Sequence, residues 1–222
     1  MIQINKKITP YNFTAMTNKK NEYIVIHYVG AVSTAKNNVD YYARERLQAS
    51  AHYFVDADSI WQSVEDGNSA WHCGGGLQGN NGHTYYGKCK NSNSIGIEMC
   101  CFKDMTGRWF FANETVKNTV QLVKYLMAKH NIPIENVIRH YDVTGKICPA
   151  PYVDESAWKE FKSMVAKKEI IEYTDPNDIV WELANRKIVS DSKGMLNAIK
   201  QEPNGRLYWL ARKTVQYMRE RD

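Results

Sequence analysis

Two histidines and one cysteine, His27, His140 and Cys148, are of the residue types that bind a metal ion which takes part in chemistry. His27 ends an apolar run that starts at Tyr23, and Cys148 follows His140 by eight positions. Two imidazoles and one thiolate form a three-ligand set for zinc, and three protein ligands leave a fourth position open, as a catalytic site requires. Together these residues predict a zinc hydrolase.

Two further residues supply the groups that such a hydrolase needs. Glu98 is the one acid in an apolar segment that reads as a strand, and we expect this strand to lie beside that of His27. Its carboxylate could take a proton from the attacking water. Lys146 lies two residues before Cys148 and could stabilise the charge that develops on a carbonyl oxygen. Amide hydrolysis is the natural use of this set.

The elements that position these residues follow from hydrophobic periodicity and from turn and cap residues. Asn38 is the expected cap of the first helix, and Pro133 is expected to end the second. The pattern predicts strands at 22–29, 94–101 and 137–138, a hairpin over 51–64, and helices at 38–48, 114–130 and 154–166.

A long segment rich in Gly and Asn, residues 66–93, is expected to shape a cleft, because loops of this length within compact domains are usually functional. Cys73 and Cys89 flank its glycines. The chain has five cysteines, an odd number, and no apparent export signal, so free or metal-bound thiols are the default. A bridge between Cys73 and Cys89 formed after export is the alternative.

Composition narrows the function classes. The chain has 222 residues, 43% of them hydrophobic, which is enough for a globular core. A net charge of +5 is spread along the chain, which argues against nucleic acid as a partner but suits the anionic polymers of a bacterial wall. No apolar run approaches the roughly 18 residues of a membrane span. The N-terminal residues do not resemble a signal peptide, so we expect synthesis in the cytoplasm.

The periodicity also predicts a division into domains. We expect a catalytic domain at 1–166, a linker at 167–175 and a small helical domain at 176–222. Asp175 followed by Pro176 is a helix start, and further helices are expected at 190–200 and 207–219. The last domain is rich in basic residues and carries four aromatic residues: Trp181, Tyr208, Trp209 and Tyr217. It could target the wall or form a homodimer, or its aromatics could simply make its core.

The chain resembles the zinc-dependent N-acetylmuramoyl-L-alanine amidases of the type-2 amidase family, whose fold phage amidase-type lysozymes and peptidoglycan-recognition proteins share. The resemblance covers about residues 20–166. It depends on segments that occur in the family's order, namely residues 24–27, 50–55, 70–72, 93–98 and 139–149. It implies an α/β fold in which helices flank a mixed central β-sheet.

The resemblance also implies residue roles. His27, His140 and Cys148 would bind Zn²⁺, Glu98 would be the general base and Lys146 would stabilise the oxyanion. Some relatives have a tyrosine where this chain has Ala51, which places more weight on Glu98. Candidates for the substrate cleft are His52, Trp71, His72 and Asn93, although packing within the domain is an alternative for them.

The expected function is hydrolysis of the amide bond between N-acetylmuramic acid and L-alanine of bacterial peptidoglycan, in a phage or prophage endolysin or an autolysin. The enzyme would reach the wall through a holin-type pore or on lysis. A cytosolic amidase that recycles muropeptides is an alternative. A receptor that binds without cutting is a second, although Cys148 favours an enzyme. A structural zinc site is a third, and would need His52 or Asp142 as a fourth ligand.

Overall fold

The protein is described by a computed structural model that covers residues 2–78, 84–167, 176–203 and 205–219. The contacts within the chain divide it into two compact units, Met1–Ala166 and Lys167–Asp222. The expected linker, 167–175, lies almost entirely outside the described residues. Each unit is described by itself below.

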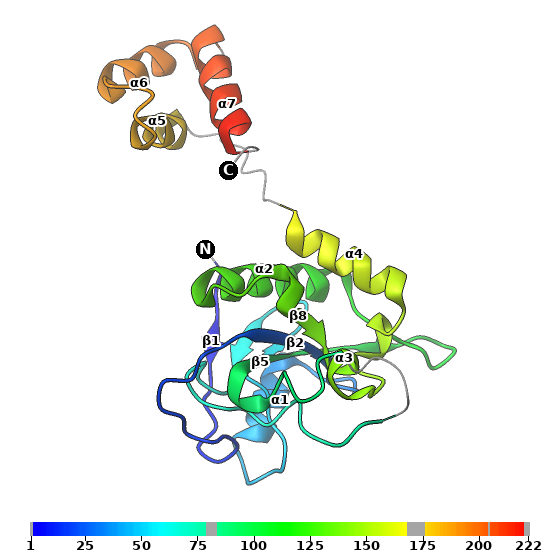
Figure 1. The fold of residues 1–222 in the computed structure, drawn as a ribbon. Coiled ribbons are helices and arrows are strands. Elements are labelled where there is room, and N and C mark those ends of the chain that lie inside the picture. Colours follow the sequence, from blue (N-terminus) through cyan, green and yellow to red (C-terminus); the bar gives the residue numbers. More distant parts are fainter. Residues whose placement is uncertain (1, 79–83, 168–175, 204, 220–222) are drawn as a thin grey trace. The chain divides into compact units, whose positions relative to one another are not determined.

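The first unit is built on a six-stranded sheet with the order β1-β4-β3-β5-β2-β8 (Figure 1). The four strands β3, β5, β2 and β8 are parallel, whereas β4 runs antiparallel to β3 and β1 runs parallel to β4. The strands are β1 (Asn5–Lys6), β2 (Tyr23–Tyr28), β3 (Tyr53–Val55), β4 (Ile60–Gln62), β5 (Ser94–Met99) and β8 (Val137–Arg139). A separate two-stranded ribbon pairs β6 (Phe102–Lys103) with β7 (Trp109–Phe110). The structure thus confirms the mixed α/β fold.

Helices α2 (Asn113–His130) and α4 (Glu155–Ala166) cover one face of the sheet (Figure 1). Side chains alternate between the two faces of a strand, so every second residue of β2 and β5 points toward these helices. Those residues form the main apolar core with the helices: Ile24, Ile26, Ile95, Ile97, Met99, Leu122, Val123, Leu126 and Phe161.

The opposite face of the sheet is covered by the short helices α1 (Ala35–Tyr42) and α3 (His140–Thr144) and by long loops. Its apolar contacts fall into two smaller clusters, one around Phe54 with α1 and one around Val25 with the 73–89 loop. The remaining alternate residues of β2 and β5 lie on this face, His27 and Glu98 among them. The candidate site is therefore on the less apolar side of the sheet.

The structure confirms most of the expected elements, including the 51–64 hairpin and the short strand before His140. The first helix is a correction. Thr34, not Asn38, caps α1, because the Thr34 hydroxyl accepts a hydrogen bond from the main-chain N–H of Asn37 at 3.1 Å. The helix ends at Tyr42 and not at 48, because the side-chain amide of Asn12 binds the carbonyls of Tyr42 and Glu45 and so competes with helical hydrogen bonds.

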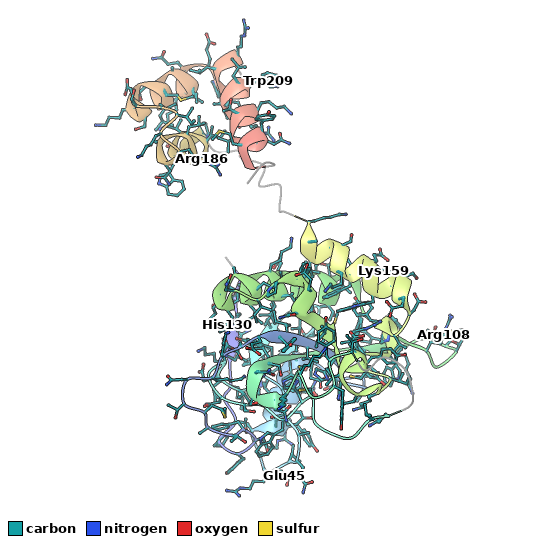
Figure 2. All side chains as sticks on the ribbon, viewed as in Figure 1. Glu45, Arg108, His130, Lys159, Arg186 and Trp209 are labelled. Carbon is teal, nitrogen blue, oxygen red and sulfur yellow. The ribbon has the colours of Figure 1, made fainter. Side chains whose placement is uncertain are left out.

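The second unit contains three helices, α5 (Pro176–Asn185), α6 (Ser192–Gln201) and α7 (Arg206–Arg219). Its small core consists of aliphatic residues: Ile179, Val180, Leu183, Ile199, Ala211 and Val215. Trp181, Trp209 and Tyr217 are largely exposed, with Trp209 labelled in Figure 2, whereas Tyr208 packs against the core. Most of these aromatics thus lie on the surface. In the part of the chain that the structure describes, no helix combines the length and apolar character needed to cross a bilayer.

Candidate metal centre

The three predicted ligands meet at the carboxyl edge of the parallel strands. His27 lies next to last in β2, and His140 begins α3 directly after β8, the neighbour of β2. The register pairs Ile26 with Arg139, so the residues that follow them, His27 and His140, leave the sheet side by side. Ligand sites in α/β sheets form at this edge, where strands end and loops begin.

Cys148 returns to the same point because the chain turns back after α3. Gly145 ends this helix in the left-handed conformation, with φ of 79°, which glycine adopts without steric cost. The carbonyl of Cys148 then accepts a hydrogen bond from the main-chain N–H of Tyr141 at 2.8 Å. This closed loop explains why ligands eight residues apart can share one ion.

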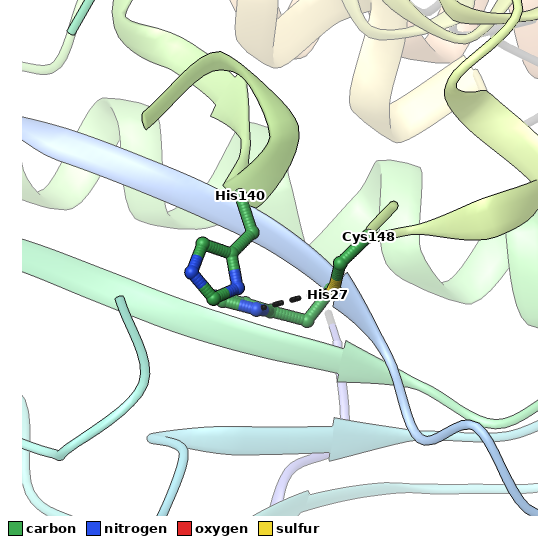
Figure 3. A group of neighbouring side chains, drawn as sticks. All are labelled: His27, His140 and Cys148. Atoms are coloured by element: carbon green, nitrogen blue, oxygen red, sulfur yellow. Dashed lines mark hydrogen bonds between the residues drawn. The ribbon is translucent and has the colours of Figure 1, made fainter. Parts of the chain in front are cut away.

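The donor atoms of His27, His140 and Cys148 all lie within 4.8 Å of one another, and all three side chains are buried (Figure 3). Nδ1 of His27 is 3.6 Å from Sγ of Cys148. Both ring nitrogens of His140 are buried without a hydrogen-bond partner, although the carbonyl of Gly74 approaches the ring. An orphaned imidazole beside a thiol and a second imidazole fits a metal ion, which would satisfy it.

Burial keeps the two imidazoles neutral, as metal binding requires. Desolvation, followed by the neighbouring His140 and His72, holds the pKa of His27 well below its usual range. Desolvation and then Lys146 lower the pKa of His140 to about 4. Without an ion, burial raises the pKa of the Cys148 thiol to about 12, even though the main-chain N–H of Tyr28 points toward the sulfur. A divalent cation would therefore displace a thiol proton on binding.

Glu98 lies beside His27, as the sequence predicts, because the two residues are register partners in β5 and β2. Its Oε2 is fully shielded from solvent and has no hydrogen-bond partner. Burial raises the pKa of Glu98 to about 7, although the positive charge of Lys146 opposes this shift. A carboxyl group with such a pKa can accept and release a proton near neutral pH.

Lys146 is exposed, in the loop between α3 and Cys148. Its positive charge acts on all three predicted ligands and on Glu98, and it works to lower the pKa of each. The five residues of the predicted metal and catalytic set thus lie close enough together for the charge of Lys146 to act on the other four. Their catalytic roles are taken up under the proposed function.

His52 lies behind the site and has no exposed surface. Its Nδ1 accepts a hydrogen bond from the main-chain N–H of Gly96 at 3.0 Å, so the ring proton is on Nε2, which faces the carbonyl of Asn68 at 3.1 Å. Half-buried Lys19 lies 3.0 Å from Nε2 and donates to three main-chain carbonyls: Asp66, Asn68 and Ser94. These bonds give His52 a structural task, and its role toward substrate stays a prediction.

His72 is also buried, and its ring lies between His27 and Ser94. Asn93 is occupied by the turn before β5, since its side chain binds Glu22, Lys88 and Lys90. Neither residue presents free polar atoms to a cleft in this structure, so a direct role in substrate binding stays a prediction for both.

Trp71 lies on an open pocket of about 560 Å³ that is lined by residues within 69–75 and 86–92 and by Val143 and Thr144 of α3. Its ring nitrogen donates a hydrogen bond to Thr14, which fixes the ring at the rim. Tyr86 and Asn91 line the same pocket. Cys73 and Cys89, which also reach this pocket, are free buried thiols.

Ser94, Gly96 and Lys19 support the site, and the sequence reasoning missed them as functional residues. A signal for the first two was present, because Ser94, Gly96 and Glu98 alternate along one strand and must share a face. Nothing in the sequence marks Lys19, whose carbonyl partners come from two distant segments, residues 66–68 and Ser94.

The family model described as N-acetylmuramoyl-L-alanine amidase matches residues 17–151. The chain belongs to this amidase family. The matched range contains the three candidate ligands, Glu98 and Lys146, and it excludes the C-terminal helical unit. The geometry at the sheet edge is therefore that of an amidase-family domain.

Among relatives of this amidase-family chain is the N-acetylmuramoyl-L-alanine amidase CwlL of Bacillus licheniformis, with 33% identity over 165 residues, covering 68% of this chain and 43% of CwlL. The chain thus spans less than half the length of this curated relative. The structure of PlyL has 28% identity and a TM-score of 0.59, and the match covers 74% of this chain and 98% of PlyL. A mutant endolysin from Bacillus subtilis has 30% identity and a TM-score of 0.57, with 75% and 100% covered.

Proposed function

We propose that this protein is a zinc-dependent N-acetylmuramoyl-L-alanine amidase that cuts the amide bond between N-acetylmuramic acid and L-alanine of bacterial peptidoglycan. The observation that carries the proposal is the buried group of His27, His140 and Cys148 beside the shielded carboxyl of Glu98. Family membership supports the substrate class. Two imidazoles and a thiolate favour zinc over magnesium or calcium, which prefer oxygen ligands.

The residues divide the work of amide hydrolysis. When bound, zinc acts as a Lewis acid and lowers the pKa of a coordinated water to about 7. Glu98 takes a proton from the attacking water and delivers it to the amine that leaves. The ammonium of Lys146 faces the carbonyl oxygen as negative charge develops there. Because Lys146 is exposed on a loop, its side chain can reorient toward the carbonyl oxygen when substrate binds.

Two observations favour an enzyme over a structural zinc protein. Among the described residues the candidate group has three members, which leaves a coordination position open. The two side chains that could have supplied a fourth ligand are bound elsewhere, His52 to Gly96 and Asn68, and Asp142 to Arg139.

A receptor that holds muropeptide without cutting it has no use for a carboxyl group shielded next to the ligands. The cost of burying Glu98 without a partner is understandable where the group must exchange a proton. We therefore place the catalytic function first and binding alone second.

The decisive experiment is digestion of purified cell wall, with an assay for both new amino groups and new reducing sugar ends. The expected result is new amines that begin with L-alanine and no increase in reducing ends. Reducing ends would indicate cleavage between sugars and would overturn the proposal. Soluble muropeptide should be tested in parallel, because cleavage of muropeptide alone would indicate an enzyme of recycling.

Removal of the metal tests the cofactor. The chelated protein should lose activity, and zinc at one equivalent should restore it, with cobalt and manganese as comparison ions. A structural zinc site would behave differently, because removing its ion unfolds the domain. Circular dichroism of the chelated protein separates these outcomes, since the amidase domain should keep its fold.

For the C-terminal unit we propose a role in holding the enzyme at the wall, with a homodimer as the second possibility. Exposed Trp181 and Trp209 are suited to stacking on sugar rings, and an excess of basic residues attracts anionic wall polymers. Action at the wall of a Gram-positive cell, after release by lysis or through a holin-type pore, belongs to the same proposal. Replacing both tryptophans by alanine should weaken sedimentation with cell walls and leave cleavage of soluble muropeptide unchanged.

A further inference from the structure

His72 lies behind the candidate ligand His27, on the side away from the thiol of Cys148. Nε2 of His27 is 3.1 Å from Nδ1 of His72, and Nε2 of His72 is 3.2 Å from the hydroxyl oxygen of Ser94. That hydroxyl is 2.5 Å from the main-chain carbonyl of Lys90. Three buried side chains thus form a continuous hydrogen-bonded row that ends on the main chain.

The carbonyl at the end of this row fixes the direction of every hydrogen bond in it. A carbonyl can only accept, so Ser94 donates its proton to Lys90. The serine oxygen then accepts from Nε2 of His72. Since His72 carries its proton on Nε2, its Nδ1 must accept the Nε2 proton of His27.

The other end of the row agrees with this assignment. A neutral His27 with its proton on Nε2 has a free lone pair on Nδ1, which faces Sγ of Cys148 at 3.6 Å. A thiol at this position can donate a hydrogen bond to that lone pair, which is consistent with the order of the row. Cys73 lies 3.7 Å from the serine oxygen, but its thiol donates to Oδ1 of Asn91 at 3.3 Å, so it leaves the order of the row unchanged.

The backbone is shaped to hold the His72 ring in place. A Cβ at position 96 would lie 2.4 Å from Cγ of His72, so only glycine leaves room for the ring on β5. Asn91 fixes the main chain of the same loop, because its Oδ1 accepts from the N–H groups of His72 and Cys73. One face of β5 therefore carries three alternate residues with different tasks: Ser94, Gly96 and Glu98. Ser94 binds the His72 ring, Gly96 leaves room for that ring, and Glu98 supplies the carboxyl group.

We infer that His72 and Ser94 are positioning residues for the metal site, which hold His27 in the tautomer that presents Nδ1 to the ion. This inference rests on the proposed metal site but extends it to residues that touch neither ion nor substrate. Partners of this kind orient a histidine ligand, and their loss typically costs about 10- to 100-fold in metal affinity. It gives His72 a task other than substrate binding.

The tautomer can be read directly in the metal-free protein by ¹⁵N NMR of the histidine rings. Nε2 of His27 should show the shift of a protonated nitrogen and Nδ1 that of a bare one. In Ser94→Ala, which removes the link to the carbonyl of Lys90, this preference should weaken. Ser63→Ala is the matched control, because Ser63 is equally buried and its hydroxyl has no partner. A proton on Nδ1 of His27 in the wild type would overturn the inference.

Zinc affinity, measured by competition with a chromogenic chelator, is the second readout. We expect Ser94→Ala to lose about 10-fold and His72→Leu up to about 100-fold, with Ser63→Ala unchanged. His72→Asn should recover much of the loss, because its side-chain oxygen can accept from His27. Equal affinity in the wild type, Ser94→Ala and His72→Leu would refute the role.

The design separates this inference from the proposed function. If zinc affinity falls as expected but wall digestion yields no L-alanine amines, the positioning role stands and the amidase assignment fails. If wall digestion succeeds and the variants bind zinc like the wild type, the amidase stands and the positioning role fails. If His72→Leu does not fold, Ser94→Ala still decides the matter, since it removes a single oxygen.

Discussion

The two faces of strand β5 carry side chains of opposite character. Ile95, Ile97 and Met99 point toward α2 and α4 and have no exposed surface. The alternate residues Ser94, Gly96 and Glu98 carry a hydroxyl, no side chain and a carboxyl group, and they face the candidate metal site. In this strand of six residues, one set of alternate positions packs in the apolar core and the other set lines the candidate site.

This arrangement shows how a buried site can be kept polar without weakening the fold. Unpartnered polar groups cost stability when buried, and those of Glu98 and His140 lie on the face that carries only two small apolar clusters. The large core lies on the opposite face, one residue away. Changes at adjacent positions of β5 should therefore affect different properties, and this expectation can be tested.

The largest effect is expected for Glu98→Gln. Glutamine has nearly the same shape but cannot accept the proton, so turnover on cell wall should fall by about 10²- to 10⁴-fold. Zinc affinity and the urea midpoint should stay close to those of the wild type. The measurement is the initial rate of amine release with a metal-loaded enzyme.

Glu114→Gln is the control for this change, because Glu114 is exposed on α2, where it pairs with Lys117. Its turnover should equal that of the wild type. Full activity in Glu98→Gln would mean that another group transfers the proton. The site face of β5 would then have no demonstrated role in catalysis.

The next effect is expected one residue away, at Ile97→Ala. This change leaves a cavity in the main core and should lower the free energy of unfolding by about 2 to 5 kcal/mol. Turnover of the folded fraction should change little, because the Ile97 side chain points away from the site. A variant that keeps its stability and loses its turnover would show that the two faces are not independent.

A smaller effect is expected where a charged group borders the apolar face. Asp66 is buried, and burial alone would oppose its ionisation, but hydrogen bonds from Lys129, Tyr53 and His130 lower its pKa. His130 is labelled in Figure 2. Asp66→Asn removes the charge and should lower the free energy of unfolding by about 2 kcal/mol, since Lys129 is partly exposed.

The pH dependence of this contribution has a definite sign. The folded pKa of Asp66 lies below the unfolded value of 3.8, so the contribution is complete above that value and is lost as the pH falls through the folded pKa. Denaturation of the wild type and Asp66→Asn should therefore differ at pH 6 and converge toward pH 2. A constant difference would contradict the assignment.

The sequence was sufficient for the parts of the fold that local patterns determine. Alternation predicts both β2 and β5, and the order of the motifs predicts that His27, Glu98 and His140 share an edge of the sheet. The end of α1 could not be predicted, because it depends on Asn12, some thirty residues earlier in the chain. Caps and side-chain bonds across such separations leave no periodic signal.

The candidate site, like the fold, could be predicted only in part. The candidate metal ligands can be recognised by their residue types, but the positions of His52 and His72 depend on tertiary contacts with Gly96 and Ser94. The sequence alone does not distinguish a histidine that binds substrate from a histidine that orients a metal ligand. Only the surroundings of the ring distinguish them.

The smallest effect is expected in the pH dependence of stability on the site face. Burial raises the pKa of Glu98 from 4.5 to about 7, so the folded state holds this proton more tightly than the unfolded state. The resulting stability is fully present below pH 4.5 and is lost as the pH rises through 7. Because Glu98 keeps some exposure, the effect should be on the order of 1 kcal/mol. Metal-free wild type should thus lose more stability between pH 5 and pH 8 than metal-free Glu98→Gln, which cannot titrate there. If the two proteins instead lose the same stability in urea between pH 5 and pH 8, the Glu98 carboxyl group is solvated in the folded state, and burial does not raise its pKa.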